Sequence, residues 1–381
     1  MRWGEEHEAF RSMVRDLVER EINPHVDEWE AVGHFPAHEL FPRLGELGLL
    51  GLEYDPAYGG GGADHLFTLI AGEEYGRITA AGVAMAIGVQ TSMATPSLHE
   101  FGSDELKRRY LAPAIAGTAV AAIAVTEPDA GSDVSAIRTR AVRDGDDWVI
   151  NGRKLYITNG AQADWVCLLA RTSDEGGYRG MSQIIVPTAT PGFRVARTLD
   201  KLGNRSSDTA ELVLDDVRVP VDHTIGTPGR GFEQQMRQFV RERMTAAYTI
   251  VGQCEHALAR TREYVAQRHV FGEPLARAQY VAFRLTELSA QLELLRSHNY
   301  QCATSLAAGE DVTRGATVAK LAAGRLAREV ADVCLQFHGG VGYMEEMWTA
   351  RFFRDMRLSS IGGGADEVML KVLARLDGLP T

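Results

Sequence analysis

Apolar residues recur at helical spacing through the first third of the chain. Within residues 5–22 they fall on one face of the expected helix: Phe10, Met13, Val14, Leu17 and Val18. Pro24 follows where this helix is expected to end, because proline has no backbone N–H to donate. Further along, Ser103 precedes Asp104 and Glu105, the order of a capping hydroxyl ahead of an acidic first turn. Residues 1–122 are therefore predicted to form a helical domain.

Near residue 123 the pattern changes to the alternation of polar and apolar residues that strands show. Within residues 138–158, Asp144-Gly145 and Asn151-Gly152 each predict a hairpin turn, because glycine accepts the positive φ that tight turns require. Further strands are expected at residues 165–170, 183–186 and 210–214. Residues 123–230 are therefore predicted to form a mostly antiparallel, barrel-like β domain.

The helical period returns after Gly231 and persists to the end of the sequence. One apolar stripe on a long helix consists of Phe232, Met236, Phe239, Val240, Ala247, Ile250 and Val251. Breaks are expected near Gly272-Glu273-Pro274, at Gly309 and at Gly339-Gly340. Residues 231–381 are therefore predicted to form a helical bundle, which makes the fold class α+β.

Composition narrows the range of partners. The net charge of −11 argues against a nucleic acid or an anionic membrane surface. The four cysteines form no CxxC pair and the eleven histidines show no metal-ligand spacing, so neither a metal site nor a disulfide framework is expected. No stretch is apolar enough to span a membrane, and the acidic N-terminus is unlike a targeting sequence. We expect a cytoplasmic protein from a bacterium.

The common nucleotide-binding motifs do not occur. Gly59–Gly62 is not followed by Lys-Ser or Lys-Thr, and no GxGxxG segment joins a strand to a helix, so neither a P-loop nor a Rossmann domain is predicted. The segment Ala124–Asp133, AVTEPDAGSD, lies where the helices give way to strands. On its residues alone it is either an ordinary loop with Thr126 as a turn hydroxyl, or a ligand-binding loop whose Gly131-Ser132 backbone admits close approach.

Three later segments bear on this choice: Tyr156–Gly160 (YITNG), Arg268–Gly272 (RHVFG) with Gln279 after it, and Gln336–Tyr343 (QFHGGVGY). Together with AVTEPDAGSD, and in the same order, they resemble the flavin-contacting segments of the acyl-CoA dehydrogenase family. The resemblance runs from the first helix to about Leu376. It implies FAD as cofactor and the fold of that family, with an N-terminal helical domain, a middle antiparallel β domain and a C-terminal four-helix bundle.

The resemblance also implies roles for single residues. Val125 and Thr126 would hold the pyrimidine edge of the flavin, where negative charge collects on reduction. Arg268 would neutralise the cofactor pyrophosphate; the alternative on its residues alone is a salt bridge at a helix end. Tyr156 stands where many relatives have Trp, and its ring would lie against the isoalloxazine. The full set assigned to the cofactor is Val125, Thr126, Ser132, Tyr156, Thr158, Arg268, Phe271, Gln279, Gln336, Gly339, Gly340, Ala365 and Glu367.

The catalytic base of this family is a carboxylate that removes the α-proton of a thioester. In many relatives it lies in the loop that matches Ile361–Ala365, but this chain has Gly363 at that position. In isovaleryl- and long-chain acyl-CoA dehydrogenases it is a Glu before an Arg on the long helix, and this chain has Glu242-Arg243 there. The resemblance therefore implies Glu242 as the base. By periodicity alone, Glu242 lies off the centre of the apolar stripe between two arginines, a pattern typical of solvated ion pairs.

Several residues are implied as substrate contacts. Gly362 and Gly363 remove side chains from the pocket wall, which leaves room for branched or bulky acyl groups. The helix that matches residues 90–94 lines the deep end of the acyl pocket in relatives, so an apolar and roomy end is expected there. The full set assigned to the substrate is Ser132, Arg243, Gly362, Gly363, Met93 and Ala94.

The function implied by the resemblance is FAD-dependent α,β-dehydrogenation of an acyl-CoA thioester, with electrons passed to an electron-transfer flavoprotein. Arg268 and Gln279, which reach a neighbouring subunit in the family, imply a homo-oligomer, by family habit a dimer of dimers. Three alternatives stay open at this point. They are a flavin oxidase or monooxygenase on the same fold, a dehydrogenase of an acyl-carrier-protein thioester, and a non-catalytic binding module.

Overall fold

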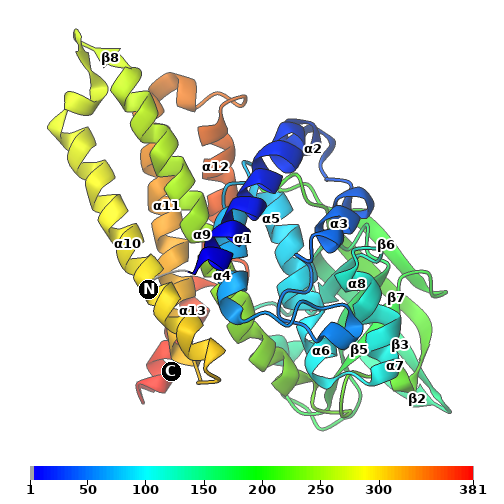
Figure 1. The fold of residues 1–381 in the computed structure, drawn as a ribbon. Coiled ribbons are helices and arrows are strands. Elements are labelled where there is room, and N and C mark those ends of the chain that lie inside the picture. The colour runs from blue at the N-terminus through cyan, green and yellow to red at the C-terminus, as the bar shows by residue number, and fades with distance from the viewer. Residues whose placement is uncertain (1–3, 381) are drawn as a thin grey trace.

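The computed structural model describes residues 4–380. Its chain runs through a set of short helices, a curved sheet and a bundle of long helices, in that order (Figure 1). The N-terminal helices are α1 (Glu5–Leu17), α2 (Val26–Val32), α3 (Ala37–Glu46), α4 (His65–Tyr75), α5 (Ala81–Gly88), α6 (Pro96–Phe101), α7 (Asp104–Leu106) and α8 (Ala112–Ile115). The predicted fold class is confirmed.

The ends of these helices follow local chemistry in part. The Ser103 hydroxyl accepts a hydrogen bond from the backbone N–H of Leu106 at 3.2 Å, so the predicted cap at the start of α7 is confirmed. The helix predicted over residues 5–22 is formed by α1 and a π-helical turn at Val18–Ile22, and Pro24 lies in a separate 3₁₀ turn at Asn23–His25 that leads into α2. Proline is tolerated in a first helical turn, where its missing N–H would have no partner. Gly33 ends α2, with a φ of +89°.

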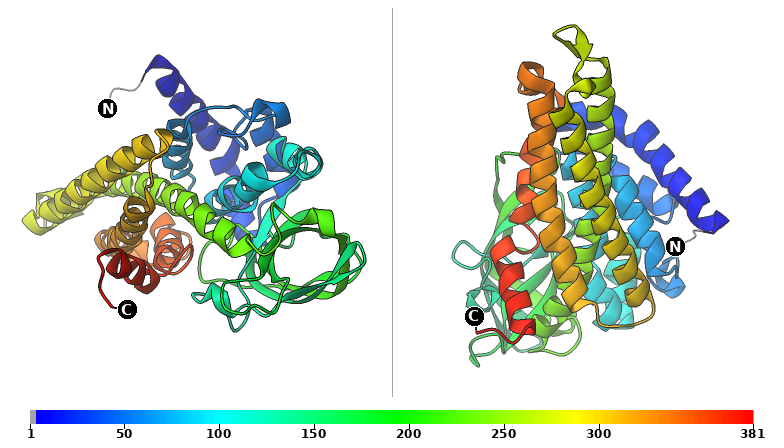
Figure 2. Two further views of the ribbon diagram at one scale, coloured as in Figure 1. Left: turned by 90° about the horizontal axis from the view of Figure 1, so that it is seen from below. Right: turned by 90° about the vertical axis from the view of Figure 1, so that its left-hand side faces the viewer.

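The middle domain is a seven-stranded sheet. Its strands are β1 (Ala121–Ala124), β2 (Arg140–Asp144), β3 (Asp147–Thr158), β4 (Trp165–Arg171), β5 (Met181–Pro187), β6 (Phe193–Thr198) and β7 (Thr209–Pro220). They follow the order β1-β4-β2-β3-β7-β6, with β5 paired to β4, and curve into a ring when seen from below (Figure 2, left). Pairing is antiparallel except where β1 and β2 meet β4. The expected strands at 165–170, 183–186 and 210–214 are confirmed.

Two details of this sheet differ from the sequence-based expectation. Asp144-Gly145 is the expected hairpin turn between β2 and β3, but Asn151-Gly152 lies inside β3 at an irregularity in its pairing with β7. A Cβ on Gly152 would lie 2.4 Å from the Thr139 hydroxyl, so this glycine permits close packing and makes no turn. Strands β1 and β6 were not predicted. Strand β1 is almost wholly buried and β6 is mostly exposed, so neither shows the alternation of buried and exposed residues that indicates a strand.

The C-terminal region consists of α9 (Gly231–Gln267), a small hairpin of β8 (His269–Val270) and β9 (Glu273–Pro274), α10 (Gln279–Ala307), α11 (Thr313–Gly342), α12 (Trp348–Met356) and α13 (Asp366–Leu376). The long helices α9, α10 and α11 lie side by side (Figure 2, right). The expected breaks at Gly309 and Gly339 are confirmed, with φ of +78° and +62°.

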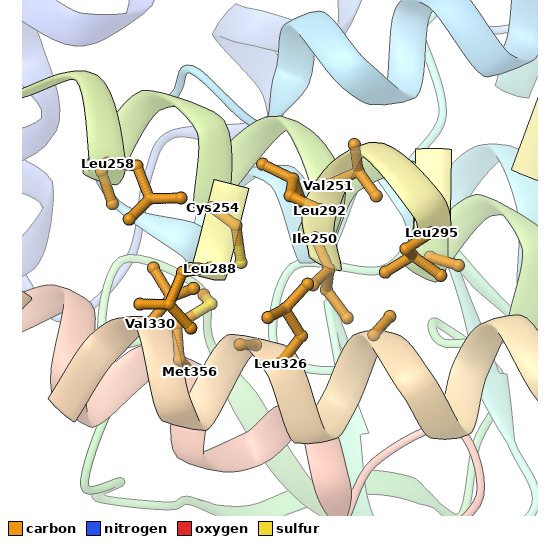
Figure 3. Packing of buried hydrophobic residues seen from close by; sticks show 14 of the residues in the cluster. Ile250, Val251, Cys254, Leu258, Leu288, Leu292, Leu295, Leu326, Val330 and Met356 are labelled. Atoms are coloured by element: carbon orange, nitrogen blue, oxygen red, sulfur yellow. The ribbon is translucent and has the colours of Figure 1, made fainter. Parts of the chain in front are cut away.

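The bundle core is made of aliphatic and sulfur-bearing side chains from four helices (Figure 3). Ile250, Val251, Cys254 and Leu258 of α9 meet Leu288, Leu292 and Leu295 of α10, Leu326 and Val330 of α11, and Met356 of α12. Burial of this apolar surface stabilises the bundle by the hydrophobic effect. All four cysteines of the chain are buried and free.

The predicted apolar stripe of α9 is correct only in its second half. Ala247, Ile250 and Val251 are buried in the bundle core, whereas Phe232, Met236, Phe239 and Val240 are half-buried. The buried positions of the first half are polar: Gln234, Gln235, Gln238 and Glu242. They are accommodated because neighbouring domains supply partners, as when the Gln238 side-chain oxygen accepts a hydrogen bond from the Ser97 hydroxyl at 2.6 Å.

The helices α4 and α9 cross at a contact made of glycines. A Cβ on Gly252 of α9 would lie 2.0 Å from the Glu73 backbone oxygen, and one on Gly76 would lie 2.5 Å from the Gln253 nitrogen. Only residues without a side chain allow the two backbones to approach this closely. The crossing joins the N-terminal helices to the bundle.

We expect Gly252→Ala to lower the free energy of unfolding by about 3 kcal/mol or more, because the added methyl group displaces α4. The matched control is Gly88→Ala, whose added Cβ meets no atom within 4 Å and whose φ of −61° is helical. This control should leave the stability unchanged or raise it by up to about 1 kcal/mol. Chemical denaturation compares the two variants, and equal stability would contradict the crossing geometry.

Candidate active site

The Glu242 carboxylate lies buried beside the backbone of the loop Ile361–Gly364. Its side chain is on α9, and the residue is 6% exposed. A Cβ on Gly363 would lie 3.3 Å from Glu242 Oε1. The two positions that the resemblance linked, one with a carboxylate and one without a side chain, are therefore neighbours in space.

Burial raises the pKa of Glu242 to about 7, while the charges of Arg243 and Lys320 act to lower it. The ion-pair pattern suggested by the flanking arginines is not present. Arg241 pairs with Glu53 at 2.5 Å, and Arg243 donates to the Thr317 hydroxyl at 3.3 Å. Glu242 is thus a buried carboxylate that ionises near neutral pH, as a general base at that pH requires.

The loop beside Glu242 has an unusual backbone. Gly363 and Gly364 have φ of +64° and +104°, which favours glycine at both positions. A Cβ on Gly362 would come within 3.4 Å of the Leu358 side chain. Ala365 precedes the first residue of α13, and the exposed Glu367 lies in its first turn.

A buried ion pair, which was not predicted from the sequence, holds the segment Ala124–Asp133 in place. Lys154 of β3 is 0% exposed, and its Nζ donates to Glu127 Oε1 and to the Val125 backbone oxygen, both at 2.9 Å. Glu127 also accepts hydrogen bonds from the backbone N–H groups of Arg138 and Thr139 at 2.6 and 2.9 Å. The only sequence signal was that Lys154 falls at an inward position of the alternating strand.

Near this ion pair, several hydrogen-bonding groups have no partner among the described residues. Within residues 4–380, the amide and hydroxyl of Thr126 and the hydroxyl of Thr158 have no hydrogen-bond partner. Ser132 is exposed on the same segment, and Tyr156 is 65% exposed with a φ of +62°. This set of donors at an open surface suits a ring that carries oxygen and nitrogen atoms along its edge.

The remaining cofactor candidates lie at the other end of the bundle. The hairpin of β8 and β9 projects past the ends of the long helices, away from the sheet (Figure 1). It carries Phe271, which is fully exposed with a φ of +54°, and it follows the exposed Arg268. A single chain therefore does not bring Arg268 close to Thr126 or Thr158.

The segment Gln336–Tyr343 lies near that hairpin. Tyr280, beside Gln279 at the start of α10, contacts the ring of Phe337 with centroids 6.1 Å apart. Gln336 is exposed, and Cβ atoms on Gly339 and Gly340 would meet nothing within 4 Å. The predicted residues thus form two separate groups, one beside the sheet and Glu242 and one at the far end of the bundle.

A cavity of about 1090 Å³ runs between α4, α5 and α9. Arg241 and Arg243 are in its wall, so it passes beside Glu242, which is not itself a wall residue. Met93 and Ala94, predicted to line the deep end, do not line it; Thr91 and Ser92 do. The chain forms a π-helical turn at Val89–Ala94, which rotates side chains relative to an α-helix, and Ala94 is buried in the core.

One part of the cavity wall carries charged side chains. Glu53 accepts hydrogen bonds from the Thr68 hydroxyl and is bonded to His65 Nδ1, both at 2.7 Å, in addition to its pair with Arg241. These contacts hold the pKa of Glu53 well below its usual range, although burial opposes them. The apolar and roomy end of the acyl pocket that was expected at residues 90–94 stays a prediction.

Three models of the acyl-CoA dehydrogenase family match nearly the whole chain. The N-terminal domain matches residues 4–118, the middle domain residues 122–217 and the C-terminal domain residues 229–376. The chain belongs to the acyl-CoA dehydrogenase family.

Individual relatives agree with this assignment. The chain is 36% identical over 371 residues to a probable acyl-CoA dehydrogenase of Bacillus subtilis, covering 97% of each chain. It is 35% identical over 377 residues to the mitochondrial long-chain specific acyl-CoA dehydrogenase of Mus musculus, covering 98% of this chain and 86% of the other. The crystal structure of an acyl-CoA dehydrogenase from Geobacillus kaustophilus superposes with a TM-score of 0.96 at 35% identity, covering 99% of each chain.

This acyl-CoA dehydrogenase is therefore an oxidoreductase with FAD as its cofactor. The unpaired donors of Thr126 and Thr158 and the bare backbone of Gly339 and Gly340 fit such a cofactor. Among residues 4–380, no cluster of His, Cys, Asp and Glu could hold a metal ion. In the same part of the chain, no helix combines the length and apolarity needed to cross a membrane.

We expect Lys154→Met to lower the free energy of unfolding by about 3–5 kcal/mol, because it leaves the Glu127 carboxylate buried without its partner. Replacing both residues, Glu127→Gln with Lys154→Met, should cost less than the sum of the two single changes. Chemical denaturation at neutral pH measures this double-mutant cycle. Additive single effects would show that the two side chains do not interact.

Proposed function

We propose that this acyl-CoA dehydrogenase removes the α-proton of an acyl-CoA thioester with Glu242, forming the trans-2-enoyl thioester. The observation that carries the proposal is the buried Glu242 carboxylate beside Gly363, with its pKa raised to about 7. A carboxylate with a pKa near neutrality holds a proton more tightly than a solvated one, and it is still ionised in part at neutral pH.

The reaction breaks two C–H bonds of the acyl group. Glu242 takes the α-hydrogen as a proton, and the electron pair of the α-C–H bond becomes part of the new double bond. The β-hydrogen leaves as a hydride, with the electron pair of its own C–H bond. FAD, when bound, supplies the acceptor for that hydride. A closed cavity would keep water away from the carboxylate and raise its basicity further.

The neighbours of Glu242 support a role in substrate binding. Arg243 lies in the cavity wall with a buried Nε that has no partner among the described residues. Gly362 and Gly363 leave the space beside the carboxylate free of side chains, so a branched or bulky acyl group can be accommodated. Ser132, exposed at the edge of the flavin segment, is proposed to contact the thioester arm.

A complete site would require a second copy of the chain. One group of cofactor candidates lies on the β8–β9 hairpin and the adjoining helix ends, away from the sheet that carries Thr126 and Thr158 (Figure 1). This group consists of Arg268, Phe271, Gln279, Gln336, Gly339 and Gly340. An exposed arginine and bare glycine backbone suit the phosphate and adenine portion of a cofactor held by a neighbouring sheet. We propose a homo-oligomer, by family habit a dimer of dimers, that passes electrons to an electron-transfer flavoprotein.

The first test mixes the enzyme anaerobically with butyryl-, isovaleryl- and palmitoyl-CoA and records the flavin absorbance. Wild-type enzyme should bleach with at least one of them, and the rate should rise as the pH rises through about 7, because the base acts in its ionised form. Glu242→Gln should bind FAD normally and lose at least about 1000-fold in bleaching rate, since no other carboxylate replaces the base.

The control for this test is Glu255→Gln, on the same helix, whose carboxylate pairs with Arg296 far from Gly363. It should bleach like the wild type. Full activity of Glu242→Gln would refute the base assignment. Rapid hydrogen peroxide formation in air would favour an oxidase, and bleaching only by acyl-carrier-protein thioesters would change the carrier.

A second test asks whether Arg268 serves the neighbouring subunit. Arg268→Glu and Glu242→Gln chains are each expected to be inactive alone, because each lacks one part of every site. In a mixed pair, one of the two sites combines Glu242 of the Arg268→Glu chain with Arg268 of its neighbour, and the other site has neither residue. A mixed pair should therefore show up to about half of the wild-type activity. If Arg268 serves its own chain, mixed oligomers will be inactive.

A further inference from the structure

Lys320 of α11 lies beneath the loop that borders Glu242. Its residue is 2% exposed, and its Nζ donates to the Ser359 backbone oxygen at 2.7 Å and to the Gly364 backbone oxygen at 3.3 Å. These two carbonyls are on either side of Gly362 and Gly363. The ammonium group thus holds both ends of the segment whose middle faces the carboxylate.

Lys320 and Glu242 approach the same glycine. The position of a Cβ on Gly363 is 3.5 Å from Lys320 Cε and 3.3 Å from Glu242 Oε1. Each charge stabilises the other, because Lys320 acts to lower the pKa of Glu242 and Glu242 acts to raise that of Lys320. Burial dominates both groups and brings the pKa of Lys320 down to about 8.

The same face of α11 contacts both halves of the site. One turn before Lys320, the Thr317 hydroxyl accepts a hydrogen bond from Arg243 at 3.3 Å. One turn after it, Gly324 lets the helix approach Ser359, whose backbone oxygen would be 2.6 Å from an added Cβ. Because of these contacts, α11 fixes the distance between the helix that carries Glu242 and the loop that covers it.

The charged groups around this pair are few. Glu242 faces Arg243 of its own helix and Lys320 of α11, and the segment 361–365 has no titratable side chain. Lys320 also faces Asp366 of α13, which lies 3.7 Å from both Arg325 and Arg328. Lys320 is therefore the cation that approaches the carboxylate from outside its own helix.

We propose that Lys320 is a positioning residue for Glu242: it holds the glycine loop against the carboxylate and places a positive charge on the far side of that loop. The inference rests on the proposed function of Glu242 as the base. An aliphatic side chain of the same length could fill the space, but it would leave two loop carbonyls unpaired and remove the nearby charge. If Lys320 only stabilised the fold, its replacement would matter through the unpaired carbonyls alone, and the loss of charge would have no effect on Glu242.

The first experiment needs no substrate and uses the FAD-loaded enzyme. The chain has only five lysines, so ¹³Cε-lysine labelling gives a spectrum with few signals to assign. Lys320 should titrate near pH 8, and in Glu242→Gln its pKa should fall by about one unit, because the stabilising anion is gone. The pKa values of Lys154 and Lys201, which have no contact with Glu242, should stay the same. An unchanged Lys320 titration in Glu242→Gln would overturn the proposal.

The second experiment changes the lysine. Lys320→Gln keeps a hydrogen-bond donor for the loop but removes the charge, whereas Lys320→Met removes both. With whichever of butyryl-, isovaleryl- or palmitoyl-CoA bleaches the wild type fastest, both variants should bleach about fivefold more slowly at pH 7, because the rising limb moves about one unit higher. Lys320→Gln should recover its rate at high pH more fully than Lys320→Met.

The matched control is Lys201→Met. Lys201 is a half-buried lysine whose pKa is also lowered to about 8 by burial, and it donates to the Ser207 backbone oxygen in the middle domain. Its loss should reduce stability without moving the pH profile. An unshifted profile in folded Lys320→Gln would refute the charge effect. If wild type bleaches with no thioester, the proposed function fails, and the lysine titration still decides the contact between Lys320 and Glu242.

Discussion

A carboxylate removed from water, beside a backbone that offers no side chain, is the feature on which the site of this protein depends. Burial disfavours the charged form of Glu242, and two cations, Arg243 and Lys320, oppose that effect. Gly363 is necessary for this arrangement, because a side chain there would lie against the carboxylate oxygen. The glycine in the loop thus leaves room for the carboxylate on the helix.

The helix that carries Glu242 joins two environments. The second half of α9 is in the aliphatic core of the bundle, where Val251 and Cys254 are fully buried. The first half buries amides and a carboxylate against the N-terminal helices and the sheet. Because the core fixes one half of this 37-residue helix, it also fixes the position of Glu242 on the other half.

The positions of the remaining cofactor candidates are the reason for proposing an oligomer. Thr126 and Thr158 are half-buried in the sheet domain. The hairpin with Phe271 extends away from the sheet (Figure 1). A fully exposed phenylalanine on a projecting hairpin is unfavourable in water. A neighbouring copy that covers the hairpin would remove that cost and would complete the set of cofactor contacts at the same time.

Local patterns in the sequence determined the order of helices, strands and helices, the cap at Ser103 and the break at Gly339, because each depends on residues close together in the chain. The resemblance to the family located Glu242 and Gly363. Only the tertiary structure decided that Glu242 is buried, that Gly152 lies within a strand, and that Lys154 and Lys320 are buried cations. Periodicity describes the apolar face of one element, whereas the burial of a polar side chain depends on partners that other elements supply.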